Sequence, residues 1–208
     1  MKHPSHSLQR SAAFTLIEML VVIAVLAILF ATATPVAMGV LQSSRLNSAG
    51  EACLGRLIEA QQMAIAQDTD VEVRILEGAD LLDKSPRWCA IQLFTLKASD
   101  TLPTDDASNK TAFQTAGAAL RLDSTVAVRS DAKLSSVFNL KNVTDNATTG
   151  FSHYVAFRFH SDGSTDLTPG KTWFLTLAEA SAPTTSTPAN YYTIQVDPAT
   201  GRLRTYRP

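Results

Sequence analysis

One long apolar segment lies near the start of the chain. Between Phe14 and Val40 the sequence holds 27 residues with a single charged side chain, Glu18. This run exceeds the roughly 20 apolar residues that a helix needs to cross the hydrocarbon core of a bilayer. The leader before it carries Lys2 and Arg10 and no acidic residue, and such a basic leader stays in the cytoplasm. We therefore expect a membrane-spanning helix that sends the rest of the chain outside.

A second hydrophobic pattern continues the helix beyond the apolar segment. Small or apolar residues recur every three or four positions, at Leu46, Ala49, Cys53, Leu57, Ala60 and Ala64. This spacing is typical of the buried stripe of an amphipathic helix. The polar residues 68–70 interrupt the pattern, so one helix is predicted from Phe14 to about Ala66. We expect Pro35 to bend it, because proline removes a backbone hydrogen bond from the helix interior.

From Val71 onward, polar and apolar residues alternate with the period of two that is typical of β-strands. The main strands are predicted over residues 71–77, 88–96, 151–159, 172–178, 191–196 and 202–206, with shorter candidates at 120–122, 126–128 and 137–140. The polar stretch 97–117 is predicted to be a surface loop, and residues 197–201 are predicted to turn the last hairpin.

This order of elements predicts an α+β fold, in which a long N-terminal helix packs on an antiparallel β-sheet domain. We divide the chain into a leader (1–13), a transmembrane half of the helix (14–41), an amphipathic half (42–68) and an antiparallel β domain (69–208). The part that follows the membrane segment has the size of one ordinary domain.

Charge and cysteine content add little that is specific. The net charge is −1, and without Lys2 and Arg10 the chain has 16 basic against 19 acidic residues, a net charge of −3. Bulk charge therefore does not indicate a protein that binds nucleic acid. Cys53 and Cys89 would face an oxidising compartment, which permits a disulfide. Two small buried thiols are the alternative, since one cysteine lies in a helical pattern and the other in a strand pattern.

Three interpretations compete for the apolar segment. A cleaved secretory signal has an apolar core of only about 7 to 15 residues. A plain anchor leaves Glu18 unexplained, because a carboxylate at bilayer depth costs about 2.5 to 3.5 kcal/mol. The third interpretation explains both the length and the charge. Ala13, followed by residues 14–18 (FTLIE) and an apolar helix with Pro35, resembles the class III signal of type IV pilins and type II secretion pseudopilins.

The resemblance implies a processing route and a set of partners. A prepilin peptidase would cut between Ala13 and Phe14 and methylate the new N-terminus at Phe14. Ala13 departs from the family, which usually has glycine before the cut. Glu18 would meet the N-terminal amine of a neighbouring pilin-like subunit in an assembled filament. The protein would lie in the bacterial inner membrane as a single-pass protein with a periplasmic C-terminal domain, and it would reach a pseudopilus by assembly.

A narrower resemblance covers more of the chain. Residues 57–76 (LIEAQQMAIAQDTDVEVRIL) and the hairpin around residues 200–202 are similar to the GspH/FimT minor pseudopilins. Five strings, VEVRI, AIQLF, FRFHSDGSTDL, WFLTL and IQVDPATGRLRTYRP, resemble Verru_Chthon cassette protein D. The implied function is a minor pseudopilin that enters or initiates a pseudopilus of a type II secretion or type IV pilus system. The alternatives are a DNA-binding minor pilin at a filament tip and a membrane-tethered domain that does not polymerise.

Catalytic chemistry is considered and set aside. His153, His160, Ser161, Asp162, Ser164 and Asp166 lie close in sequence, as in nucleophilic or metal sites. Strand alternation places the two histidines on opposite faces, and Asp-Gly-Ser is typical of a turn. A calcium ion near Asp162 stays open, because Asp162, Ser164 and Asp166 offer hard oxygen ligands but lack a distal bidentate glutamate. We expect no enzyme activity and no cofactor.

The C-terminal arginines have two interpretations. Arg202 and Arg204 fall on one face of the last strand, with Arg207 close by. Charged residues of this kind protect the edge of a sheet from pairing with other strands. The motif G-R-L-R also resembles the G-R-x-R motif with which FimT proteins contact DNA, which makes the three arginines candidate nucleic-acid contacts. We favour the charged edge strand and do not expect nucleic acid as a partner.

Overall fold

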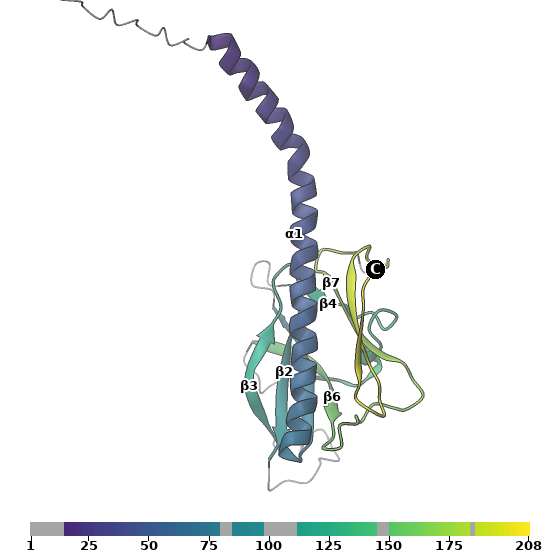
Figure 1. Cartoon of the computed structure of the whole chain (residues 1–208). Coiled ribbons are helices and arrows are strands. Elements are labelled where there is room, and N and C mark those ends of the chain that lie inside the picture. Colours follow the sequence, from purple (N-terminus) through teal and green to yellow (C-terminus); the bar gives the residue numbers. More distant parts are fainter. Residues whose placement is uncertain (1–14, 80–84, 98–111, 145–149, 184–185) are drawn as a thin grey trace, which may run out of the picture. The chain divides into compact units, whose positions relative to one another are not determined.

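The computed structural model describes residues 15–79, 85–97, 112–144, 150–183 and 186–208, without the side chains of residues 32–37. Ala13 and Phe14 lie outside the described residues, and so does the side chain of Pro35. The chain divides into two units, Met1–Leu41 and Gln42–Pro208. The expected α+β class is confirmed, with one N-terminal α-helix and antiparallel sheets (Figure 1).

The first element is α1, Leu16–Gln67, a helix of 52 residues. It begins after Thr15 and continues without a break through the position of Pro35. It ends where Asp68 takes a positive φ of 47° and the Thr69 N–H donates to the Ala64 carbonyl at 3.2 Å, a common way for a helix to stop. None of the helices in the described part of the chain combines the length and apolar character that crossing a membrane requires.

The C-terminal unit contains two antiparallel sheets. The five-stranded sheet has the order β3-β2-β1-β6-β5 and the four-stranded sheet has the order β4-β7-β8-β9. The strands are β1 Val71–Ala79, β2 Pro86–Leu96, β3 Phe113–Arg121, β4 Val126–Val128, β5 Asn142–Thr144, β6 Phe151–Phe159, β7 Trp173–Glu179, β8 Tyr191–Val196 and β9 Leu203–Tyr206. All six main strands predicted from the sequence are confirmed. The turn after β6 does not close a hairpin onto β7, because these strands belong to different sheets.

Two predictions for the middle of the chain were wrong. Residues 113–117, expected in a loop, begin β3, a strand at the edge of its sheet whose largely exposed side chains leave no alternation to detect. Residues 137–140, expected as a strand, lie mostly in a short 3₁₀ helix, Ser136–Asn139. Here the hydroxyls of Ser135 and Ser136 accept the backbone N–H groups of Thr176 and Phe174 at 2.9 and 2.8 Å. Side chains thus occupy the edge of β7 where a further strand would pair.

One hydrophobic core joins the helix to both sheets. The six stripe residues of the sequence analysis, Leu46 to Ala64, are all buried, which confirms the predicted pattern. They pack with Val71, Val73 and Ile75 of the five-stranded sheet and with core residues of the four-stranded sheet such as Ile194. The C-terminal half of α1 is therefore part of the core of this unit.

A glycine in α1 sets how closely β8 approaches the helix. A Cβ atom at Gly50 would lie 2.4 to 2.6 Å from three ring atoms of Tyr192. The Tyr192 hydroxyl also donates to Glu51 Oε1 at 2.7 Å. The ring thus packs against the bare helix backbone while its hydroxyl is held by the next residue of α1, so Gly50 has a packing role that outweighs its poor helix propensity.

We predict that Gly50→Ala destabilises the protein although alanine favours helix. Overpacking against Tyr192 costs about 1 to 3 kcal/mol, more than the roughly 1 kcal/mol that alanine gains in a helix. Gly55 is the matched control, because nothing lies within 4 Å of a Cβ atom there, and Gly55→Ala should stabilise. Thermal unfolding of the detergent-solubilised full chain measures both changes. Equal stabilisation by the two substitutions would refute the packing role of Gly50.

Candidate functional site

The N-terminal candidate site begins with a hydrogen-bonded turn at the start of α1. The Thr15 Oγ1 accepts the Glu18 N–H at 3.3 Å, and Glu18 Oε2 accepts from the Thr15 N–H and Oγ1 at 3.3 and 3.2 Å. This reciprocal arrangement is a capping box, which satisfies backbone donors that the first helical turn leaves unpaired. The sequence signal for a capping box, threonine followed three residues later by glutamate, lies within the FTLIE motif. The sequence analysis did not predict the box from it.

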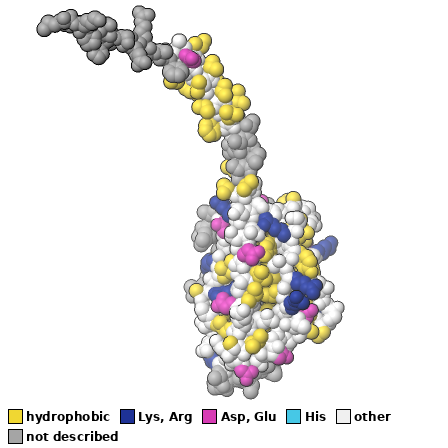
Figure 2. Space-filling view, viewed as in Figure 1, with side chains coloured by type: hydrophobic (Ala, Val, Ile, Leu, Met, Phe, Trp, Pro, Cys, Tyr) yellow, Lys and Arg dark blue, Asp and Glu magenta, His cyan; other side chains and the backbone are white. Residues whose placement is uncertain are grey.

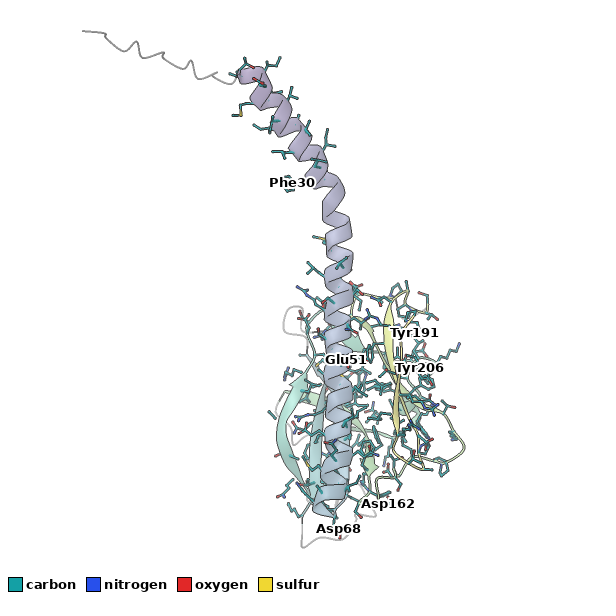
Figure 3. The ribbon with its side chains drawn as sticks, viewed as in Figure 1. Phe30, Glu51, Asp68, Asp162, Tyr191 and Tyr206 are labelled. Carbon is teal, nitrogen blue, oxygen red and sulfur yellow. The ribbon has the colours of Figure 1, made fainter. Side chains whose placement is uncertain are left out.

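The residues after Glu18 are apolar on all sides of the helix. Among the described side chains between Leu16 and Leu41, fifteen large hydrophobic ones are exposed, by 45 to 84% of their surface. Figure 2 shows these side chains on the described N-terminal part of α1, and Phe30, which is 69% exposed, projects away from the helix (Figure 3). A helix that is hydrophobic all round normally belongs in a protein core or a membrane.

The candidate arginines of the tail are all exposed, but Arg207 is also hydrogen-bonded to α1. β9 is an edge strand, and Arg202 and Arg204 are exposed. Arg207, by contrast, donates to the Asn47 Oδ1 at 2.8 Å and to the Ser43 Oγ at 2.7 Å. Its guanidinium therefore ties the C-terminus to α1. Arg202 and Arg204 alone would neutralise few phosphates, and electrostatic affinity for nucleic acid grows with that number.

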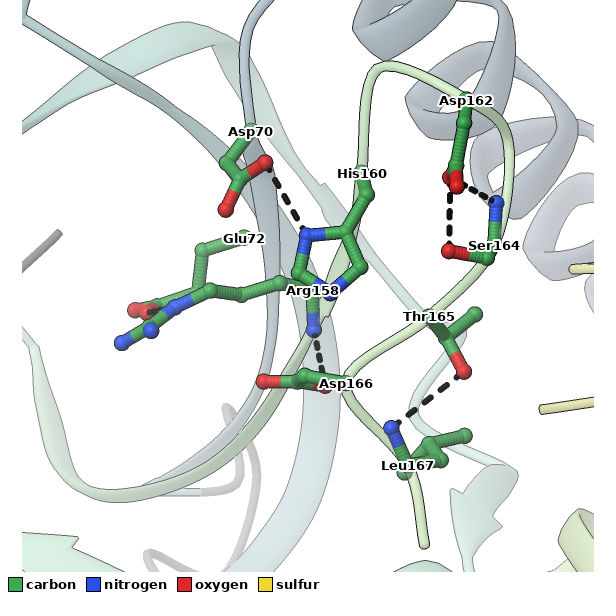
Figure 4. Close-up of polar contacts among 9 residues, drawn as sticks. All are labelled: Asp70, Glu72, Arg158, His160, Asp162, Ser164, Thr165, Asp166 and Leu167. Atoms are coloured by element: carbon green, nitrogen blue, oxygen red, sulfur yellow. Dashed lines mark hydrogen bonds and ion pairs between the residues drawn. The ribbon is translucent and has the colours of Figure 1, made fainter. Parts of the chain in front are cut away.

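The tempting catalytic residues are separated by the fold. His153 Nδ1 pairs with Glu77 Oε2 at 2.8 Å at one end of β6. His160, just beyond the other end, pairs through its Nδ1 with Asp70 Oδ1 at 3.0 Å (Figure 4). Each pair links β6, or the residue after it, to β1, or the residue before it. Each histidine therefore has a structural role at one end of the β1–β6 strand pair.

The candidate calcium ligands are engaged in local hydrogen bonds. Asp162 Oδ1 accepts from the N–H and the Oγ of Ser164 at 2.8 and 2.6 Å, and Asp166 Oδ1 accepts the Arg158 N–H at 2.8 Å. Figure 4 shows the two carboxyl groups well apart. Across the described ranges, no cluster of His, Cys, Asp and Glu side chains is arranged to hold a metal ion. Cys53 and Cys89 are both buried thiols, and burial raises the pKa of Cys53 to about 12.

A buried charge network on the five-stranded sheet was not foreseen. Glu72, 1% exposed, accepts from Arg74 Nε at 2.6 Å and from Arg158 Nε at 3.0 Å. The Arg74 guanidinium lies between the rings of Phe94 and Tyr154, 3.9 and 4.4 Å from their centroids. In the sequence Glu72 and Arg74 look like the polar side of a half-exposed strand, and nothing local shows that this side is buried as well.

Asp166 lies beside this network and gives stability a pH dependence. Asp166 keeps an exposed surface, yet the protein atoms around its carboxyl group partly desolvate it and raise its pKa, against the opposing influence of its hydrogen bond from Arg158. Asp162, fully exposed, has its pKa lowered by the hydrogen bonds from Ser164. A raised folded-state pKa means that the folded state holds the proton more tightly than the unfolded state, so stability falls as pH rises through that range. A lowered pKa has the opposite sign.

As pH rises above about 3.9, the ordinary aspartate pKa, Asp166 should lower the free energy of unfolding of wild type. We predict that this decrease is absent in Asp166→Asn. The amide oxygen still accepts the Arg158 N–H, and the variant has no charge at this partly desolvated position. Asp162→Asn is the control of opposite sign, because it removes stability that is lost as pH falls. Denaturant unfolding of the detergent-solubilised chain over acidic to neutral pH compares the slopes. A steeper fall in Asp166→Asn than in wild type would contradict the assignment.

Comparison with known proteins gives one sequence match and several structural ones. Residues 8–34 match the family described as the prokaryotic N-terminal methylation motif. No curated protein matches the chain. The fold is similar to the minor pseudopilin EpsH from the Type 2 Secretion System of Vibrio cholerae, with 11% identity, a TM-score of 0.43, and coverage of 79% of this chain and 98% of that chain. It is also similar to the type IV minor pilin FimU of Pseudomonas aeruginosa, with 14% identity, a TM-score of 0.40, and coverage of 78% of this chain and 97% of that chain.

Proposed function

We propose that this chain is a pilin-like structural subunit that is processed by a prepilin peptidase and assembled with other pilin-like subunits into a pseudopilus or pilus. The observation that carries the proposal is the methylation motif over residues 8–34, which leads into a helix that continues without a break into the core of the C-terminal unit. One element can therefore hold the subunit among its neighbours and also carry the folded domain.

The first part of the proposal is membrane insertion of residues 14–41. A run of 27 residues with one charge is long enough to cross a bilayer. The large hydrophobic side chains of this run are exposed on every side of the helix, and lipid or neighbouring apolar helices would cover them. The basic leader would keep the N-terminus in the cytoplasm, which places the C-terminal unit in the periplasm.

The second part concerns Glu18. Its carboxylate stands in an apolar segment and would be costly at bilayer depth. The capping box with Thr15 offsets part of this cost, since it supplies two donors to Glu18 Oε2. A carboxylate can accept further hydrogen bonds, and the amine of a processed neighbour would add the positive charge that Thr15 lacks. Glu18 would then favour assembly over the isolated subunit.

A more specific proposal is a minor pseudopilin that enters or initiates a pseudopilus, as the resemblance to GspH/FimT proteins and to Verru_Chthon cassette protein D implies. The tail gives little support to a DNA-binding tip, because Arg207 is bound to Ser43 and Asn47. A tethered domain that never polymerises would leave Glu18 without an assembly partner.

We predict that the mature protein starts at Phe14 and carries one methyl group on its N-terminal amine. The test is intact-mass spectrometry of the membrane fraction from cells with a prepilin peptidase, compared with cells that lack it. Removal of residues 1–13 only in the presence of the peptidase supports the proposal. A protein that still begins at Met1 in both strains would reduce the N-terminal segment to a plain anchor.

A further inference from the structure

The two sheets present four edges in the described part of the C-terminal unit, and these edges are very different. β4 and β5 have three residues each, and β9 has four. β3 has nine residues, Phe113–Arg121, and ends its sheet next to β2 (Figure 1). Native proteins protect sheet edges by keeping them short or by placing charges on them. The edge at β3 is the long one.

The edge at β3 also lacks charge. No charged residue occurs from Phe113 to Leu120, and Arg121 is the first. Around β9, by contrast, Arg202 and Arg204 are both exposed. A long edge strand without charged residues is the type that pairs with a strand of another molecule.

The backbone of β3 shows which groups are available. The Lys97 N–H donates to the Ala112 carbonyl at 2.9 Å, and the register continues from there to the pair Phe94 and Thr115. In an antiparallel ladder, residues alternate between bonding to the neighbour and pointing away from it. Gln114 therefore bonds to β2, and the N–H and C=O of Thr115 point away from β2, toward the open edge.

The second half of β3 is occupied in a different way. Gly117 has a φ of +74°, and its carbonyl accepts from Gln92 Nε2 at 2.8 Å. The Ala118 carbonyl accepts from the guanidinium of Arg56, which Glu59 holds at 2.7 Å. With respect to the described residues, the open part of the edge is thus residues 113–116, before the irregularity at Gly117. Gln114 and Thr115 are both exposed there.

We propose that β3 pairs antiparallel with β3 of a second copy of this chain, with Thr115 opposite the partner's Thr115. A two-fold axis requires the same surface on both copies, and an uncharged strand can face its own copy without repulsion. Thr115 would exchange two backbone hydrogen bonds across the axis, and a threonine pair is a favourable cross-strand pair. This pairing uses the C-terminal unit alone and goes beyond the helix-mediated assembly proposed above.

Disulfide trapping in membranes tests the contact with the full-length chain. Directly opposed residues of a hydrogen-bonded antiparallel pair have Cα atoms about 5.5 Å apart, within the range of a disulfide. Thr115→Cys should give a disulfide-linked dimer under mild oxidation, because Cys53 and Cys89 are buried. Thr205→Cys, an exposed threonine on β9, is the matched control and should stay monomeric. A monomeric Thr115→Cys protein, or equal trapping at both positions, would overturn the proposal.

A charge substitution provides the second test. Thr115→Lys places two ammonium groups opposite each other, and like charges directly opposite disfavour strand pairing. We expect the wild-type chain to sediment as a dimer in detergent, Thr115→Lys as a monomer and Thr115→Ser as a dimer. Thermal unfolding checks that Thr115→Lys folds as wild type does. A monomeric wild type, or a folded lysine variant that remains dimeric, would refute the pairing, and neither result bears on processing at Phe14.

Discussion

The C-terminal unit depends above all on the burial of one stripe of small and apolar side chains along α1. Ala49, Cys53, Ala60 and Ala64 are small, so both sheets approach the helix closely around a single core. Burial of apolar area is the dominant favourable term in folding. The stabilisation from this burial cannot be assigned to the helix or to the sheets separately, because the same residues complete the core for both. The segment of α1 that would enter the membrane therefore continues directly into the half of α1 that the domain needs in order to fold.

Polar contacts then fix where the helix lies against the strands. Gln61 Nε2 donates to the Gly163 carbonyl at 3.0 Å and to the Thr200 carbonyl at 3.1 Å. One side chain of α1 thus binds the turn after β6 and the turn between β8 and β9. A Cβ atom at Gly201 would come within 2.5 Å of Gln61 Nε2, so the approach requires glycine. Arg207 makes a second contact of this kind nearer the N-terminal end of α1, where it donates to Ser43 and Asn47.

The sequence predicted the parts of this fold that local periodicity determines. The helix stripe and the six main strands follow directly from spacings of three to four and of two. β3 and the 3₁₀ helix did not follow, because an edge strand with exposed side chains has no alternation, and the serine contacts to β7 join residues about 40 positions apart. The burial of Glu72 and Arg74 was equally hidden, since Arg158, a partner of Glu72, comes from β6.

The N-terminal site was visible in the sequence because its chemistry is local. Phe14, Thr15 and Glu18 lie within five consecutive residues of the sequence, and the apolar run that follows needs no tertiary contact to be recognised. The tail could not be interpreted in this way. Arg202, Arg204 and Arg207 form one basic group in the sequence, and all three are exposed, yet Arg207 is hydrogen-bonded to Ser43 and Asn47 of α1.

The proposed function depends on contact between Glu18 and a neighbouring pilin-like subunit, and crosslinking in cells can test this contact. Full-length wild type, Glu18→Ala and Glu59→Ala are crosslinked in the membrane, and the captured proteins are identified by mass spectrometry. Glu59 is a matched control, because it is an exposed glutamate on the same helix. The account predicts that wild type and Glu59→Ala capture other subunits with the methylation motif, whereas Glu18→Ala is inserted but captures none. Equal capture by all three proteins would contradict it.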